Sequence, residues 1–301
     1  MSVFVCGSLH YDVVVNAPHL PRLDETVPGT GVRYIAGGKG GNQAVAAARM
    51  GAPTAFAGRI GDDAFGASLL TTLANAGVDT SQMQRGAGAS GMSVAIVDPA
   101  GGYGAVIVSA ANLAIDPSLI SVPEHTKVVL LQNEVPEAVN LTVALKGRAA
   151  GASVILNAGP ARPMGADLLD AIDILVVNRV EAADLLSVPE ATLDPLEAAK
   201  ALSRLGPHAV IVTLGGDGLV FYESGVATHH PGHAVGVVST HGAGDAFLGA
   251  LAAASASGHP LEAAARFGQA AAALHVSTPV DQRHMITPAA VRMLMAQTSS
   301  R

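Results

Sequence analysis

The apolar residues of this chain fall into short continuous runs that alternate with longer alanine-rich stretches of helical period. Continuous runs, rather than alternating apolar and polar positions, are typical of strands that are covered on both faces. Strands are therefore predicted at 3–6, 54–57, 128–132, 154–157, 174–178 and 210–214. Helices are expected at 42–50, 62–76, 136–150, 194–205, 243–256, 261–275 and 288–297, several of which begin at Pro or Asp and end at Gly.

The alternation of strands and helices over most of the chain predicts a single α/β domain that spans residues 1–301. Its three layers would be a mostly parallel central sheet with helices on both faces. In such sheets a ligand binds at the carboxyl ends of the strands. Those ends are therefore the expected place for a functional site.

Two segments interrupt this rhythm. The segment at about 11–35 has a short strand signal at 13–15 among prolines and glycines, and the segment at about 91–110 predicts two strands around a turn of Asp, Pro and Gly. We expect both segments to form a small β-sheet that is inserted into the α/β body. Such a sheet would be a lid that closes over a substrate.

The composition narrows the functional classes. Hydrophobic residues are 50% of the 301 residues, yet no run reaches the ~18 strongly apolar residues of a membrane-spanning helix. No basic region precedes the first apolar run, which argues against a signal peptide. The one cysteine, Cys6, lies inside that run, as a buried structural thiol would, and a cytoplasmic location is expected. A net charge of −7 argues against nucleic acid as a partner.

A glycine-rich stretch, Gly37-Gly38-Lys39-Gly40-Gly41-Asn42, precedes a predicted helix. Glycines allow the backbone to approach a ligand closely, and Lys39 and Asn42 add polar side chains. The stretch is not a Walker A loop, because no Ser or Thr follows the lysine and Arg33 stands where the first glycine would be. It predicts a binding loop, and the alternative is a flexible turn into the helix.

Two further glycine patterns are less specific. Thr213-Leu214-Gly215-Gly216-Asp217-Gly218 follows a predicted strand, where it would hold nucleotide phosphates or form a hairpin into 219–223. Gly86-x-Gly88-x-x-Gly91 has the spacing of a dinucleotide fingerprint, but no strand is predicted before it and a strand, not a helix, after it. We therefore interpret it as a loop, and an NAD-dependent oxidoreductase is disfavoured.

The most informative stretch is Thr240-His241-Gly242-Ala243-Gly244-Asp245-Ala246-Phe247. Its glycines place free backbone N–H groups at the start of a predicted helix, where phosphate binds through those donors and the helix dipole. Asp245 lies in the first helical turn. It is either a capping residue or a carboxylate that accepts the proton of a substrate hydroxyl beside a transferring phosphoryl group.

Four motifs occur in a fixed order: Gly7-Ser8-Leu9-His10-Tyr11-Asp12, Gly38-Lys39-Gly40-Gly41-Asn42, Asn178-Arg179-Val180-Glu181 and Gly242-Ala243-Gly244-Asp245. With these motifs the chain resembles the ribokinase-like (PfkB) carbohydrate kinases over nearly its full length. The resemblance implies the ribokinase-like fold, a three-layer α/β/α body with a small inserted β-sheet lid. In this family the lid often mediates dimerisation, so a homodimer is implied.

The resemblance also implies a role for each matched residue. Asp245 would be the catalytic base, and the N–H groups of Gly242, Ala243 and Gly244 would form the anion hole. The implied sugar-binding residues are His10, Asp12, Gly38, Lys39, Gly40, Gly41, Asn42 and Glu134. Glu181 would order Mg²⁺ at the triphosphate of ATP. The implied ATP-binding residues are Asn178, Thr213, Leu214, Gly215, Gly216, Asp217 and Gly218.

Three departures from the family pattern affect specificity and ion dependence. His10 stands where many ribokinases carry Asn, next to the sugar-binding region. Ser239 stands where the family usually has Asp before the Thr of its signature, at a site for K⁺. The segment 277–282 has no glycine where a glycine-containing loop normally forms the opposite wall of that site. Weak activation by K⁺ is therefore expected.

These observations together predict an ATP-dependent kinase that transfers the γ-phosphoryl group to a hydroxyl of a small sugar, with ribose as the first candidate. A nucleoside kinase of the same fold is the nearest alternative, because nucleosides also present ribose hydroxyls. A catalytically inactive sugar-binding regulator is an alternative of a different class. The presence of Asp245 and its glycines argues against that regulator, which would not need the base.

Overall fold

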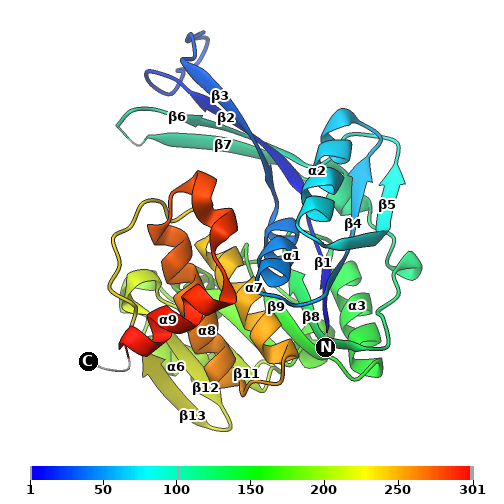
Figure 1. Ribbon diagram of the computed structural model, residues 1–301, viewed down its shortest axis with the longest axis vertical. Coiled ribbons are helices and arrows are strands. Elements are labelled where there is room, and N and C mark those ends of the chain that lie inside the picture. The colour runs from blue at the N-terminus through cyan, green and yellow to red at the C-terminus, as the bar shows by residue number, and fades with distance from the viewer. Residues whose placement is uncertain (1, 101, 299–301) are drawn as a thin grey trace.

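The protein folds into a large and a small β-sheet with helices packed on the large one (Figure 1). The computed structural model describes residues 2–100 and 102–298. The large sheet has the strand order β13-β12-β11-β10-β9-β8-β1-β4-β5. Its strands are β1 (Ser2–Cys6), β4 (Thr54–Gly61), β5 (Asp79–Gly86), β8 (Thr126–Gln132), β9 (Ser153–Asn157), β10 (Ile174–Asn178), β11 (Ala209–Thr213), β12 (Leu219–Glu223) and β13 (Val226–His230).

The strands from β11 through β5 are parallel, and only β12 and β13 run antiparallel to their neighbours. The prediction of a mostly parallel sheet is therefore confirmed. In β1, Val3 and Val5 belong to the core on one face of the sheet, and Phe4 and Cys6 belong to the core on the other. This alternation follows from the two-residue period of a strand. Cys6 is fully buried, and burial raises the pKa of its thiol to about 12, as a structural thiol requires.

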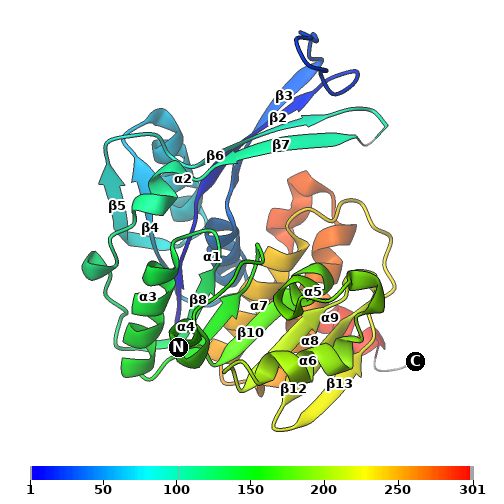
Figure 2. The same cartoon turned by 180° about the vertical axis from the view of Figure 1, so that it is seen from behind.

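Helices cover both faces of the large sheet. Core residues of α1 (Lys39–Arg49), α2 (Ala64–Asn75), α7 (Ala243–Ala256) and α8 (Leu261–Ser277) pack on one face, and α9 (Pro288–Thr298) lies outside α8 (Figure 1). The other face, seen in Figure 2, is covered by α3 (Glu137–Ala149), α4 (Ala166–Ala171), α5 (Arg179–Leu186) and α6 (Pro195–Ser203). In the described part of the chain, no helix has both the length and the apolar character that crossing a membrane would require.

The small sheet has the order β3-β2-β6-β7, and it projects from the body as an arm (Figures 1 and 2). Its strands are β2 (His10–Asn16), β3 (Gly31–Gly37), β6 (Met92–Val97) and β7 (Tyr103–Val108). The two predicted lid segments are therefore confirmed as strands of one separate sheet. The parallel pairing of β2 with β6 joins them, because each segment otherwise forms its own antiparallel hairpin.

Several elements differ from the sequence prediction. The polar strand β5 and the helices α4 and α5 are not predicted, because their apolar pattern is weak or short. The prediction that no strand precedes Gly86 is wrong, since β5 ends there, but a strand, β6, does follow. The stretch Lys39–Asn42 is the first turn of α1 rather than a loop, with Gly38 as its N-cap at φ 90°.

The helices α1 and α7 cross at a glycine. A Cβ atom added to Gly249 of α7 would contact Ala46 and would lie 2.7 Å from the backbone oxygen of Gln43 in α1. Only a glycine allows two helix backbones to approach this closely. The contact fixes the N-terminal half of α1, which carries Asn42 and Gln43, against the first turns of α7.

Gly249→Ala tests this contact. Alanine raises helix propensity by about 1 kcal/mol over glycine, but overpacking typically costs about 1–3 kcal/mol. Here the obstructing atoms are the Cβ of Ala46 and backbone atoms of α1, which cannot rotate away. We expect a net loss of about 1–2 kcal/mol in the free energy of unfolding, measured by urea denaturation. The control is Gly236→Ala, since a Cβ there meets nothing within 4 Å. Equal stability of the two variants would contradict the close crossing.

Candidate active site

The carboxyl ends of five adjacent strands bring the predicted residues to one edge of the large sheet. The chain moves outward from β1 in both directions, toward β4 and toward β8, so the switch point of the topology lies between β1 and β8. The segments that follow these strand ends are 7–12 after β1, Glu134 after β8, Asn157 at the end of β9, Asn178–Glu181 after β10 and Thr213–Gly218 after β11. The predicted sugar-binding residues thus lie near the switch point, and the predicted nucleotide-binding residues lie two strands further along.

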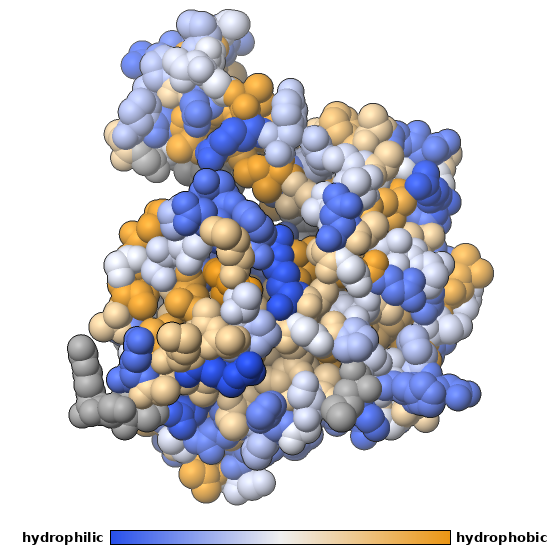
Figure 3. All heavy atoms as spheres, in the orientation of Figure 1, coloured by the Kyte–Doolittle hydropathy of each residue, from blue (hydrophilic) through white to orange (hydrophobic). Residues whose placement is uncertain are grey.

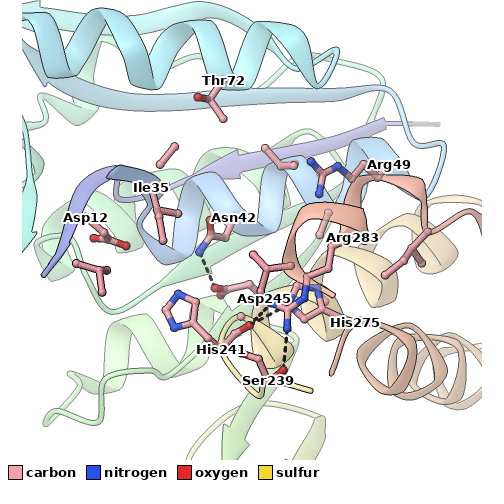
Figure 4. Close-up of a pocket in the computed structure, with 18 of the residues that line it drawn as sticks. Asp12, Ile35, Asn42, Arg49, Thr72, Ser239, His241, Asp245, His275 and Arg283 are labelled. Atoms are coloured by element: carbon pink, nitrogen blue, oxygen red, sulfur yellow. Dashed lines mark hydrogen bonds between the residues drawn. The ribbon is translucent and has the colours of Figure 1, made fainter. Parts of the chain in front are cut away.

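A cavity of about 460 Å³ lies between the lid and the body. In the space-filling view the surface is hollowed below the lid, and hydrophilic residues gather along this hollow (Figure 3). The cavity is lined by Asp12 from the lid, Asn42 from α1, and His241 and Asp245 from the start of α7 (Figure 4). Its volume falls in the range of ~300–1,000 Å³ that is usual for small-molecule sites.

The start of α7 has unpaired N–H groups. Gly242 is the N-cap residue and has a left-handed conformation, with φ 78°. The N–H of Ala243 donates to the oxygen of Thr240 at 3.1 Å, but within the described residues the N–H groups of Gly242, Gly244 and Asp245 have no acceptor. A Cβ on Gly244 would meet nothing within 4 Å, so the space beside Gly244 is open. Such a helix terminus is suited to bind an anion.

The Asp245 carboxylate is held by two side-chain amides from α1. Asn42 Nδ2 donates to its Oδ2 at 3.0 Å, and Gln43 Nε2 donates to its Oδ1 at 3.1 Å (Figure 4). Burial raises the pKa of the Asp245 carboxyl above its usual value, against the opposing effects of the Lys39 charge and of the two amides. A carboxylate with a raised pKa is a better proton acceptor, and the two amides fix its orientation.

Gln43 is a residue that the sequence prediction missed. It is fully buried, and its amide also reaches Asn157 Oδ1 at 3.3 Å. The signal in the sequence is slight: Gln43 is a polar residue at the start of a helix whose other buried positions are Gly or Ala. Because Gln43 and Asp245 are far apart in sequence, only the crossing of α1 and α7 reveals their contact.

Lys39 and Glu134 connect the switch point to α1. The backbone N–H of Lys39 donates to Glu134 Oε2 at 2.9 Å, and the hydroxyl of Ser8 donates to the same oxygen. The Oε1 atom of Glu134 has no hydrogen bond to the described part of the chain. The Lys39 ammonium lowers the pKa of both Asp245 and Glu181, so its charge acts on both ends of the site.

The lid contributes Asp12 to the cavity. Its Oδ1 accepts a hydrogen bond of 2.5 Å from Ser93 Oγ on the neighbouring strand β6. Burial raises the pKa of Asp12, and the hydrogen bond from Ser93 and the charges of His10 and His241 oppose this. His10 itself is buried, with Nε2 3.3 Å from Asn112 Nδ2 and Nδ1 3.8 Å from Glu134. Of the two residues, Asp12 lines the cavity, whereas His10 packs against Asn112 and Glu134.

Asn178 and Glu181 form a capping box at the start of α5. The N–H of Glu181 donates to Asn178 Oδ1 and the N–H of Asn178 donates to Glu181 Oε2, both at 2.8 Å. Burial raises the pKa of Glu181, and the hydrogen bond from the Asn178 backbone and the Lys39 charge lower it. The other oxygen, Oε1, lies 2.5 Å from where a Cβ on Gly159 would be, so a glycine is needed there. This oxygen fits Mg²⁺, which is usually held by one or two carboxylates together with waters and substrate phosphates.

The stretch Thr213–Gly218 lies beside this capping box, because Thr213 pairs with Asn178 across β10 and β11. The interpretation as a hairpin is confirmed, because the 3₁₀ turn at Gly215–Asp217 leads into the antiparallel strand β12. The interpretation as a phosphate-binding turn stays a prediction. Leu214 N–H donates to the oxygen of Gly218 at 2.8 Å, which closes the turn. Gly215 and Gly216 are exposed, so their backbone is accessible to a ligand.

A carboxylate beside unpaired helix N–H groups, under a lid, is arranged to take a proton from an alcohol while the charge of a phosphoryl group is stabilised next to it. The fold and the site therefore define a phosphotransferase that acts on an alcohol group.

Comparisons with known proteins agree with this class. The chain is 35% identical over 299 residues to the ribokinase of Bacillus subtilis (strain 168), which covers 98% of this chain and 99% of that protein. It is 30% identical over 259 residues to the deoxyribokinase of Salmonella typhi, covering 84% and 85% of the two chains. The structure of the Arabidopsis thaliana ribokinase complexed with ribose and ATP has a TM-score of 0.89 and 31% identity over 98% of each chain. Residues 1–287 match the description "pfkB family carbohydrate kinase", and the chain belongs to that family.

Asp245→Asn tests the role of the base. The variant can still accept a hydrogen bond from Asn42 or Gln43 but cannot take a proton, so we expect kcat to fall roughly 100–10,000-fold. The Kd for ATP, measured by calorimetry, should change by no more than a few-fold. The matched control is Asp167→Asn on the exposed side of α4, which should leave kcat unchanged. A variant with turnover within a few-fold of the wild-type rate would exclude Asp245 as the base.

Proposed function

We propose that the chain transfers the γ-phosphoryl group of ATP to a hydroxyl of a small sugar, with ribose as the first candidate. The observation that carries this proposal is the Asp245 carboxylate, held by two amides beside unpaired N–H groups. The names of the similar proteins, ribokinase and deoxyribokinase, support a pentose as the acceptor. The similar structure that holds ribose and ATP supports ATP as the phosphoryl donor.

In the proposed reaction the sugar hydroxyl oxygen bonds to the γ-phosphorus, and the bond from that phosphorus to the bridging oxygen of ADP breaks. Asp245 accepts the hydroxyl proton. The N–H groups of Gly242 and Gly244 donate to the phosphoryl oxygens, and the Lys39 ammonium adds positive charge. Mg²⁺ would neutralise charge on the ATP phosphates, and Glu181 would hold it through waters and those phosphates. Asn178 and the turn of Thr213–Gly218 would bind ATP at the neighbouring strand ends.

The cavity supports a small polyol as the acceptor. Asp12 and Asn42 present polar atoms to it, while Val14, Ile35 and Ala95 give it apolar walls. One carboxylate and one amide can bind several hydroxyls of a sugar, and the apolar walls can cover its C–H faces. A nucleoside kinase remains the alternative within the fold. The catalytically inactive regulator is disfavoured, because it would have no use for a carboxylate with a raised pKa at an anion site.

A substrate panel tests the function. ADP release is measured with ribose, deoxyribose, fructose, adenosine and uridine, at saturating ATP with and without Mg²⁺. We expect ribose or another pentose to give the highest kcat/KM, and turnover to require Mg²⁺. A nucleoside as the best substrate would favour the alternative. Binding of sugar without ADP release from any compound would favour the regulator.

We also propose a homodimer through the lid. Because side chains alternate along a strand, one lid face carries Asp12 and Ser93 toward the cavity, and the other carries the cross-strand row of Tyr34, Val94 and Val106. These three side chains are 59%, 42% and 66% exposed. An apolar row of this kind on a sheet is suited to pack against the same row of a second copy.

We propose that the enzyme acts in the cytoplasm, because that is where ATP is available.

Val106→Lys tests the dimer. A lysine in the middle of the apolar row would place a charge in the interface, so light scattering at micromolar concentration should show a dimer for the wild type and a monomer for the variant. Val226→Lys is the control, because Val226 is 64% exposed on the edge strand β13, away from the lid. A wild-type monomer, or a variant that stays dimeric, would exclude the lid as the interface.

A further inference from the structure

Arg283 is a buried cation that has no acidic partner among the described residues. It lies in a 3₁₀ helix at Val280–Met285 and is 7% exposed. Its guanidinium donates to three backbone oxygens: Nη2 to Ser239 at 2.8 Å, Nη1 to His241 at 2.9 Å and Nε to Thr278 at 3.3 Å. In the described part of the chain, no carboxylate lies within 4 Å of it.

This arrangement is unusual, because buried arginines normally pair with a carboxylate. Burial lowers the pKa of Arg283, but an arginine side chain remains charged in a folded protein. Among the described residues, the charge is therefore stabilised by backbone oxygens. The positive charge of the guanidinium can therefore attract an anion that binds nearby.

Two of the three oxygens belong to the segment just before α7, and the third, that of Thr278, belongs to the C-cap of α8. Ser239 and His241 lie in the turn that ends at the N-cap Gly242, and the oxygen of His241 also accepts from His275 Nε2 at 2.9 Å. Arg283, His241 and Asp245 line the same cavity, and Figure 4 shows the guanidinium hydrogen-bonded to Ser239 and His241. Arg283 thus fixes the turn that presents the unpaired N–H groups.

We propose that Arg283 is a positioning residue that acts as a built-in monovalent cation for the phosphoryl-transfer site. The three backbone oxygens surround one guanidinium group, and backbone oxygens are also the groups that bind alkali cations in proteins. Here the guanidinium fills the cluster of oxygens, so the positive charge is covalently attached and no ion has to be recruited. The neutral side chain of Ser239 fits this arrangement, because a carboxylate is not needed to attract an ion.

The proposal rests on the proposed kinase activity, and it implies that the rate of this activity does not depend on K⁺. The first measurement is the initial rate of the wild type against K⁺ concentration at fixed Mg-ATP and fixed ionic strength, with tetramethylammonium as the replacement cation. We expect a flat response. A many-fold, saturable rise would overturn the proposal, and this result needs no variant.

The second measurement uses Arg283→Ala, which empties the oxygen cluster. We expect kcat to fall roughly 10–100-fold. This is smaller than or close to the roughly 100–1,000-fold fall in kcat that follows removal of one oxyanion-hole donor. The lost rate should return, saturably, on addition of K⁺ or guanidinium ion, a response that a merely structural role would not give. The matched control is Arg292→Ala on the exposed side of α9, which should keep full rate and show no ion response. A loss of rate that neither ion restores would overturn the proposal.

A third measurement does not depend on turnover. The Tm of Arg283→Ala should rise with K⁺ relative to tetramethylammonium at equal ionic strength, because the emptied cluster binds the ion, whereas the wild-type Tm should not. If no sugar is phosphorylated but this difference is found, the proposed function fails and the assignment of Arg283 stands. If sugars are phosphorylated and the Tm of both proteins responds alike to K⁺, the assignment of Arg283 fails alone.

Should the alanine variant not fold, Arg283→Lys is used. Activity of that variant that does not depend on K⁺ supports the proposal, and activity that depends on K⁺ overturns it.

Discussion

The crossing of α1 and α7 at Gly249 is the contact on which the site depends. It sets the amides of Asn42 and Gln43 against the Asp245 carboxylate. The helix α1 begins at the switch point of the sheet, where its first N–H groups donate to Glu134 and Ser8. One short helix therefore joins the ends of β1 and β8 to the helix that carries the base. A shift of α1 would move the base, the Lys39 charge and the wall of the cavity together.

Much of the fold follows from sequence patterns. Continuous apolar runs predict strands that are covered on both faces, and six such runs are strands of the large sheet. The strand β5 escapes prediction because it is a polar edge strand, whose place depends on backbone pairing with β4. The glycines at 40–41 suggest a loop, yet they lie in α1. A glycine is needed at position 40 because a Cβ there would lie 2.7 Å from the backbone nitrogen of Ser8. A sequence does not distinguish a glycine that permits close approach from one that permits flexibility.

The candidate site is predicted less completely. Asp245 and Asn42 stand in recognisable motifs, and the structure brings them into contact. Gln43 and Arg283 have no motif, and their roles arise from partners that are distant along the chain. Asn178 and Glu181 carry a further lesson, because a motif expected to bind a metal is also a helix cap. The same side chains can therefore cap a helix and bind a ligand, and in Glu181 the cap uses Oε2 but not Oε1.

The lid places a strict condition on the length of its strands. Its side chains alternate between the face with Asp12 and Ser93 and the face with Tyr34 and Val94. A single-residue insertion or deletion at the start of β2 would exchange the two faces beyond that point, turning Val13 toward the cavity and Asp12 away from it. Substitutions in these strands are therefore tolerated far better than changes of length. Related chains should vary in length after Asn16 and after Val97, where the hairpins turn, and keep the strand lengths between them constant.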